Sequence, residues 1–209
     1  DCGIPMSTIE DTFIQRWARD TSYTAPSENN IFKLPTCIDD NAKSFIIDTL
    51  TNPETFQKVI DSRSCRSAAG PDMITYSIIM AGGKESGKIM AEISRKMIEC
   101  KQFPAIWAKA TSILIFKKGD PNDIANWRPL SIASSMYRIW ACAVSNTLQQ
   151  VNKNARIISK AQKGFVEKVN GCMEHTVVSN ELIFDARRKG SDIHIVALDL
   201  RDAFGSVPH

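Results

Sequence analysis

Ile113-Leu-Ile-Phe-Lys-Lys-Gly-Asp-Pro-Asn-Asp-Ile-Ala-Asn-Trp-Arg-Pro-Leu130 is an apolar run, a basic turn and a second run of extended character. The β-branched and aromatic residues from Thr111 to Phe116 predict a strand, and extended structure is expected to resume at Arg128. Two adjacent strands joined by a basic turn can lay Lys and Arg over a triphosphate, because Arg offers forked donors and Lys a mobile point charge. The alternative interpretation is a solvated hairpin tip.

Helical patterns surround this hairpin on both sides. Apolar residues recur at helical spacing in seven segments, at about 7–18, 39–50, 53–60, 74–81, 85–101, 135–150 and 174–188. A further apolar run, Ile193–Leu198, predicts a last strand. The predicted fold class is therefore α/β, or α+β with a helix-rich layer.

Charge is distributed unevenly along the 209 residues. Residues 1–62 carry a net charge of −5, residues 63–168 a net charge of +10, and residues 169–209 a net charge of −2. A basic middle of this size fits a polyanionic partner such as nucleic acid or a nucleotide triphosphate. A solvated basic surface is the plainer explanation.

Several classes of protein fit this sequence poorly. The six cysteines are spread singly and the three histidines have no ligand spacing, which argues against a structural zinc site. Cys100 and Cys142 stand in apolar helical patterns, which predicts buried thiols in a reducing compartment. No apolar stretch approaches 18 residues and no signal peptide pattern is present, so we expect no membrane span.

Asp199 follows the last predicted strand directly. Alternation along Ile193, Ile195 and Ala197 places Asp199 on their face, at the end of the strand. A carboxylate in that position suits Mg²⁺, which prefers oxygen ligands and substrate phosphates. A turn or helix cap is the alternative role for a lone aspartate.

Two glycine-containing loops, around Gly70 and around Gln162 to Gly164, could approach a ligand closely or simply form turns. Together with the hairpin and Asp199, they occur in an order that resembles the reverse transcriptases of non-LTR retrotransposons, from about Ser62 to His209. The resemblance rests on seven pieces, none specific alone: Ala69-Gly-Pro-Asp72, Trp107, Ile115-Phe-Lys-Lys-Gly-Asp120, Asn126-Trp-Arg-Pro-Leu-Ser131, Gln162-Lys-Gly-Phe165, Cys172-Met-Glu-His175 and Leu198-Asp-Leu-Arg-Asp-Ala-Phe204. The ending Ala203–His209 is similar to the R2, R4 and NeSL group, which carries a restriction-like endonuclease.

The resemblance implies a right-hand polymerase fold that is present only in part. Residues 1–51 would be an N-terminal extension, 52–171 the helix-rich fingers, and 172–209 the start of the palm through motif A. The implied activity is RNA-directed DNA polymerisation, with template RNA, a DNA primer or target and dNTPs as partners. The implied cofactor is two Mg²⁺ ions, and the implied site of action is intracellular and nuclear.

The resemblance also assigns roles near the end of the chain. Asp199 falls on the aspartate that binds both metal ions, and the backbone carbonyl of Leu200 falls on a further metal ligand. Asp202 and Ala203 fall where backbone amides approach the triphosphate. Phe204 matches the aromatic residue that excludes the ribose 2′-OH.

In the fingers, the resemblance places Arg128 and either Lys117 or Lys118 on the nucleotide. Gly70, Gln162 and Gly164 match loops that are template-contacting or structural.

The sequence departs from the family pattern in several places. Gly205 stands where many relatives have Asp, and Ala68-Ala69-Gly70 replaces the commoner Pro-Gly-Pro. The second catalytic element, with its adjacent aspartates, is not among these residues, so we expect an N-terminal fragment that is inactive alone. The rival interpretation is a non-catalytic nucleic-acid-binding relic or domesticated fragment. A group II intron maturase is a third option, which the Lys-Gly-Asp and Asn-Trp-Arg-Pro spacing disfavours.

Overall fold

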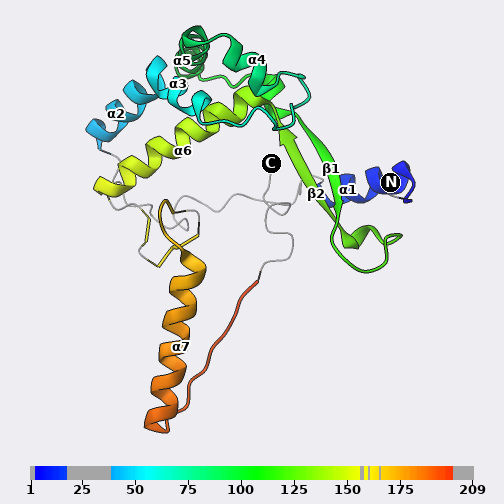
Figure 1. Ribbon diagram of the computed structural model, residues 1–209, viewed down its shortest axis with the longest axis vertical. Coiled ribbons are helices and arrows are strands. Elements are labelled where there is room, and N and C mark those ends of the chain that lie inside the picture. The colour runs from blue at the N-terminus through cyan, green and yellow to red at the C-terminus, as the bar shows by residue number, and fades with distance from the viewer. Residues whose placement is uncertain (1–2, 18–38, 156–157, 160, 165, 200–209) are drawn as a thin grey trace, which may run out of the picture. The chain divides into compact units, whose positions relative to one another are not determined.

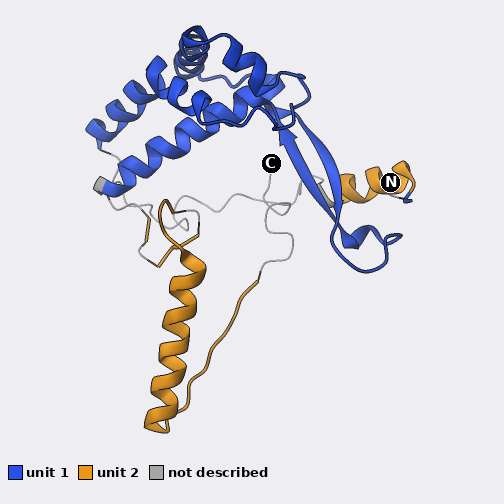
Figure 2. Cartoon of the chain, viewed as in Figure 1, with its two compact units in different colours: residues 1–4, 33–157 blue, residues 5–32, 158–209 orange. Residues whose placement is uncertain are grey.

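The computed structural model describes residues 3–17, 39–155, 158–159, 161–164 and 166–199 (Figure 1). The chain divides into two compact units, residues 1–4 with 33–157 and residues 5–32 with 158–209 (Figure 2). The predicted division into extension, fingers and palm is a functional one, and the boundaries of the compact units do not test it. It therefore stays a prediction.

Unit 1 contains five α-helices among its described residues, each where the sequence predicts one. They are α2 (Asp40–Leu50), α3 (Pro53–Asp61), α4 (Tyr76–Ala81), α5 (Lys84–Cys100) and α6 (Ser135–Ala155), with short 3-10 turns η1 (Ala105–Ala108) and η2 (Ile124–Asn126). Local capping explains where two of them begin. Asp39 Oδ1 accepts from the Ala42 backbone N–H at 2.7 Å, and Asn52 Oδ1 accepts from that of Glu54 at 2.9 Å. Pro53 then occupies the first turn, where its missing N–H costs nothing.

The core of unit 1 lies where α3 packs against α5 and α6. Phe56, Met90 and Ile139, one from each helix, are at most 2% exposed. Burying a side chain of this size stabilises the fold by about 1.5–3 kcal/mol. The helical spacing that predicted the three helices therefore also produces their common apolar face.

An aromatic cluster precedes the first strand. The Phe103 ring meets those of Trp107 and Trp140 edge-on, at centroid distances of 5.6 and 5.7 Å. Trp107, in η1, is only 5% exposed. Because β1 begins three residues later, the buried indole fixes where the strand leaves the helical core.

The two predicted strands form an antiparallel hairpin, β1 (Ala110–Phe116) with β2 (Trp127–Ala133), which extends away from the helices of unit 1 (Figure 1). Ala110 pairs with Ala133 at the root, and Phe116 pairs with Trp127 near the tip. Side chains on β1 are mostly exposed, and those on β2 are exposed or half-buried. Pro129 is tolerated because each strand of a two-stranded sheet has a free edge.

The loop around Gly70 lies against the junction of β2 and α6. A Cβ atom on Gly70 would stand 2.5 Å from the Ser134 backbone nitrogen, so only glycine fits there. Ser134 Oγ donates to Asp72 Oδ2 at 2.5 Å, and Ser135 Oγ donates to the Ile74 carbonyl at 2.7 Å. Both serines are fully buried, so this contact is part of the interior.

The described part of unit 2 contains α1 (Met6–Trp17) and α7 (Gly171–Lys189). Asn170 Oδ1 accepts from the Met173 backbone N–H at 3.3 Å, and Gly190 ends α7 with φ +64°. The helical spacing of the apolar residues at 174–188 implies that the apolar face of this helix lies inward, but Val177 and Leu182 are 52% and 55% exposed. The prediction of an inward face is therefore wrong at Val177 and Leu182, because no described residue buries either side chain.

The predicted strand at Ile193–Leu198 is also absent: residues 191–199 belong to no strand. Val196 and Leu198 are 80% and 92% exposed. A strand needs a neighbour for its backbone hydrogen bonds, and the strands of the described residues, β1 and β2, pair with each other.

The prediction of buried thiols fails at Cys100, which is exposed, while Cys142 is half-buried. Cys100 is the last residue of α5, where the helix face leaves the core. Through the described ranges, no helix has both the length and the apolar character that crossing a bilayer requires.

Replacing Gly70 with Ala is expected to destabilise unit 1 by about 1–3 kcal/mol, because the new methyl group would overlap the backbone at Ala133 and Ser134. Urea unfolding measures the change. Gly3→Ala is the matched control, since a Cβ there would meet its nearest neighbour at an ordinary 3.6 Å. Equal stability of the two variants would contradict the close approach.

Candidate functional site

The tip of the hairpin brings two cations to one face. Phe116 pairs with Trp127, and the Lys117 backbone N–H donates to the Asn126 carbonyl at 2.8 Å, which extends the ladder by one pair. Paired residues project from the same face, and successive pairs alternate between faces. Because Ile115 pairs with Arg128, Lys117 shares a face with Arg128.

This register separates Lys117 from Lys118. Lys118 stands one residue further along, after the last ladder bond and at the start of the turn. Lys117, Lys118 and Arg128 are all exposed, and no ion pair within the described residues engages any of them. Lys117 and Arg128 thus present uncompensated positive charge in one direction.

The opposite face stiffens the hairpin. The rings of Phe116 and Trp127 lie 5.3 Å apart between centroids, and Trp127 Nε1 donates to the Pro121 carbonyl at 2.9 Å. This bond ties the turn to the strand that carries Arg128, the next residue. The indole therefore holds the tip together by packing and by hydrogen bonding.

The turn itself requires Gly119. Its φ is +96°, and a Cβ there would lie 2.7 Å from Asn126 Nδ2. Asn126 Nδ2 donates to the Asp120 carbonyl at 3.1 Å, and Asp120 Oδ1 accepts from the Asn122 backbone N–H at 2.9 Å. The polar residues of the motif therefore fix the shape of the turn.

Asn126 and Trp127 stabilise the tip of the hairpin, and the sequence motifs alone assigned neither residue a role. Both stand beside Arg128 in the quoted Asn-Trp-Arg-Pro piece. Trp127 is a large aromatic residue next to Arg128 in the sequence, and this position was the signal that could have identified it.

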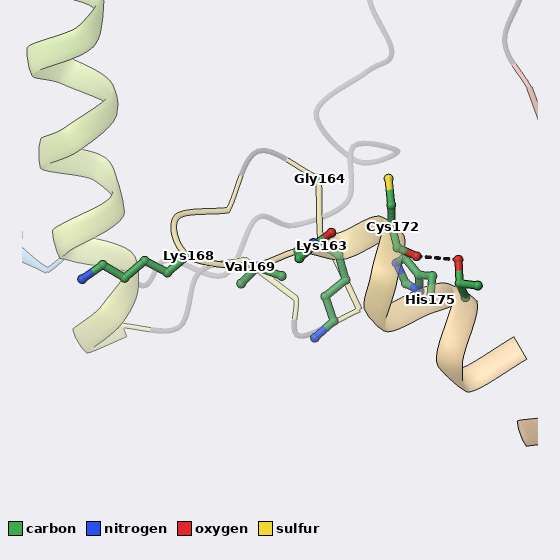
Figure 3. Close-up of a pocket in the computed structure, with 9 residues that line it drawn as sticks. Lys163, Gly164, Lys168, Val169, Cys172 and His175 are labelled. Carbon is green, nitrogen blue, oxygen red and sulfur yellow. Dashed lines mark hydrogen bonds between the residues drawn. The ribbon is translucent and has the colours of Figure 1, made fainter. Parts of the chain in front are cut away.

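The loop with Gln162 and Gly164 lies in unit 2. Gln162 Nε2 donates to the Gly164 carbonyl at 2.9 Å, so the two residues are brought together within one turn. Figure 3 shows the hollow beside this turn, where Lys163 reaches from the loop while Cys172 and His175 lie on α7. Lys163 Nζ forms an ion pair with Glu174 at 2.6 Å, and Gly171 packs tightly on Lys163. These contacts give the loop a structural role, and a template contact stays a prediction.

The predicted catalytic end of the chain is described only as far as Asp199, which is exposed. Leu200, Asp202, Ala203 and Phe204 lie outside the described residues. Among the residues that are described, no group of three or more His, Cys, Asp and Glu side chains could hold a metal ion. A single carboxylate supplies too few oxygen ligands for two Mg²⁺ ions, so the two-ion site predicted for the complete enzyme stays a prediction and needs ligands beyond the described residues.

Replacing Gly119 with Ala is expected to loosen the tip, because a φ of +96° costs a side-chain-bearing residue about 1–3 kcal/mol and the methyl group would displace Asn126. Hydrogen exchange of the Lys117 amide measures the loosening. The control is Lys118→Ala, which alters an exposed neighbouring side chain, and equally fast exchange in both variants would contradict the role of Gly119.

Comparison with known proteins gives the same relationship as the motifs. Residues 115–209 match the family described as reverse transcriptase (RNA-dependent DNA polymerase). The chain is 27% identical over 143 residues to the retrovirus-related Pol polyprotein from type-1 retrotransposable element R2 of Popillia japonica, covering 68% of this chain and 19% of that protein. It is 25% identical over 163 residues to the probable RNA-directed DNA polymerase from transposon BS of Drosophila melanogaster, covering 75% and 17%.

A third relative is the transposon TX1 uncharacterized 149 kDa protein of Xenopus laevis, 30% identical over 127 residues that cover 61% of this chain and 9% of that protein. The chain spans less than a fifth of the length of these relatives. They come from several kinds of element, so the assignment to the R2, R4 and NeSL group stays a prediction. The matched segment includes Lys117, Arg128 and Asp199, and through it this chain is recognised as similar to the reverse transcriptases of non-LTR retrotransposons.

Proposed function

We propose that these residues form the nucleotide-binding fingers and the start of the palm of an RNA-directed DNA polymerase, which adds dNTPs to a DNA primer on an RNA template. The observation that carries the proposal is the placement of Lys117 and Arg128 on one face of a stiff hairpin, with no acidic partner in the part of the chain that the structure describes. Two relatives, from transposon BS and mobile element jockey, bear the name RNA-directed DNA polymerase. Because the relatives are much longer than this chain, the activity is proposed for a longer polypeptide that contains these residues.

The proposed role of the hairpin follows from its charge and its rigidity. Phosphoryl transfer depends mainly on positioning and on stabilising charge over the phosphate oxygens. Arg128 can donate two parallel hydrogen bonds to a phosphate, and Lys117 can place a compact charge beside it. Each charge-assisted contact contributes about 1.5–3 kcal/mol. A tip fixed by its own hydrogen bonds loses little entropy when the nucleotide binds.

The end of the chain is proposed to supply the remaining contacts. Asp199 would be one ligand of a divalent cation, with the Leu200 carbonyl as a further oxygen on the nucleotide-bound ion. The backbone amides of Asp202 and Ala203 would approach the triphosphate, and Phe204 would collide with a ribose 2′-OH. Because one carboxylate cannot hold two ions, further ligands must come from residues other than those described.

The proposed macromolecular partners are template RNA and the DNA primer or target. The net charge of +10 between residues 63 and 168 supports a role in binding phosphate backbones. Binding of this kind weakens as salt rises, since released counterions drive it. Action at chromosomal DNA, and hence in the nucleus, is part of the same proposal.

Lys117→Ala in the longer polymerase is expected to lower kcat/KM for dNTP by about 10- to 100-fold, the equivalent of one lost charge-assisted contact. Lys118→Ala, one residue away and with the same change of charge, is expected to change it by less than about 3-fold. Primer extension on an RNA template at varied dNTP concentration measures both. A larger effect at Lys118 would reverse the assignment.

Arg128→Ala belongs in the same series, with Lys96→Ala as a remote control. The Lys96 ammonium donates to Glu99 at 2.9 Å, a contact that raises the pKa of Lys96, so its charge is already engaged far along α5. Arg128→Ala is expected to lower kcat/KM for dNTP far more than Lys96→Ala does. Similar decreases of kcat/KM in the two variants would refute a triphosphate contact at Arg128.

The 209-residue chain alone is expected to bind RNA and to incorporate no nucleotide, because its sequence supplies one of the motif carboxylates that a two-ion site needs. Filter binding and primer extension measure the two properties, with an active retrotransposon polymerase as the positive control. Incorporation by the 209 residues would overturn this expectation. RNA binding by a longer polypeptide that also incorporates nothing would favour the nucleic-acid-binding relic.

A further inference from the structure

The direction of the hairpin is determined at its root. β1 is exposed along most of its length and β2 alternates between exposed and half-buried side chains, with none fully buried in either strand, so little packing holds the tip against the helices of unit 1. Arg128 lies five residues before Ala133, or roughly 17 Å from the root at about 3.3 Å per residue. A tilt of about 10° at the root would therefore move the guanidinium by about 3 Å, and a displacement of 1 Å already costs an enzyme about 100-fold in rate.

A specific set of contacts holds the root of β2. Asp72 accepts two hydrogen bonds, from Ser134 Oγ at 2.5 Å and from the Ile74 backbone N–H at 3.2 Å. Ser134 directly follows β2 and is 0% exposed. The Asp72 carboxylate is therefore the acceptor for a buried hydroxyl at the point where the hairpin joins α6.

The same loop is held on both sides of Asp72. Arg138 Nη2, on the first turn of α6, donates to the Ala68 carbonyl at 2.5 Å and to Ser135 Oγ at 3.1 Å. The Arg138 guanidinium also lies 4.9 Å from the centre of the Tyr76 ring. With the loop fixed at Ala68 and by the Ser135 bond to Ile74, Asp72 cannot follow Ser134 if the root moves. This fixed carboxylate is what gives the junction a single direction.

We propose that Asp72 is a positioning residue for the nucleotide site: through Ser134 it sets the direction of the hairpin, and with it the places of Lys117 and Arg128. The part that concerns nucleotide rests on the proposed function, whereas the orientation of the hairpin does not. A carboxylate that only stabilised the loop would affect unfolding and leave the nucleotide KM unchanged.

The first test uses the 209-residue chain and measures residual dipolar couplings of backbone amides. In the parent chain and in the control Ser131→Ala, one alignment tensor is expected to fit β1, β2, α5 and α6 together. Ser131 is a fair control because it is exposed and its hydroxyl lies 3.1 Å from that of Ser112 on the neighbouring strand. In Asp72→Ala, the hairpin couplings are expected to require a separate, smaller tensor. A single tensor in that variant would overturn the proposal.

The second test uses primer extension by the longer polymerase. Asp72→Ala and Ser134→Ala are each expected to raise the KM for dNTP by about 10-fold or more, with a smaller change in kcat and unchanged affinity for primer and template. The double variant is expected to match the single ones, because both remove the same bond. Additive effects, or an unchanged KM, would overturn the positioning role.

The two tests distinguish the orientation of the hairpin by Asp72 from the proposed nucleotide-binding function. If Asp72→Ala does not fold, Ser134→Ala carries both measurements with the carboxylate in place. A reoriented hairpin with unchanged KM refutes nucleotide positioning by Asp72. Only the failure of Lys117→Ala and Arg128→Ala as well would refute the proposed triphosphate contact itself.

Discussion

The hydrogen bond between Ser134 and Asp72 joins two parts of unit 1 that are 62 residues apart in sequence. It gives the buried Ser134 hydroxyl an acceptor on the half-buried Asp72, and an unpaired buried hydroxyl would cost about 1–3 kcal/mol. Gly70 makes the bond possible, because any side chain there would keep the loop away from the Ser134 backbone. The shape of the helical unit and the direction of the hairpin therefore depend on the same close approach.

The hairpin and the helices meet different physical requirements. The helices bury Phe56, Met90 and Ile139 against one another and owe their stability to that packing. The hairpin has little core of its own, and its tip keeps its shape through Gly119, Asn126 and the Trp127 indole. A site on such a projection can present charge to a large ligand while the helices remain undisturbed, provided that its root is fixed.

The sequence predicted those features that depend on neighbours along the chain. Helical spacing, the Asn52-Pro53 start and the β-branched run before Lys117 are local signals, and the corresponding elements are present. The proposal that Lys117 rather than Lys118 contacts phosphate rests on the strand register, which the pairing of Phe116 with Trp127 defines and the sequence alone does not. The role of Ser134 was not predictable, because its partner is distant in sequence and nothing local marks the contact.

The failure at residues 193–198 has the same origin. Their alternation is typical of a strand, but a strand forms only when its backbone pairs with that of a second segment. In the described part of the chain, no strand pairs with residues 193–198. The apolar side chains of α7, which were expected to lie inward, are exposed for the corresponding reason. The hairpin carries its own pairing partner, so its cations are already in place, whereas Asp199 follows a segment without one. Of the two halves of the proposed site, the described residues thus organise the charged hairpin, whereas they include only Asp199 of the proposed metal ligands.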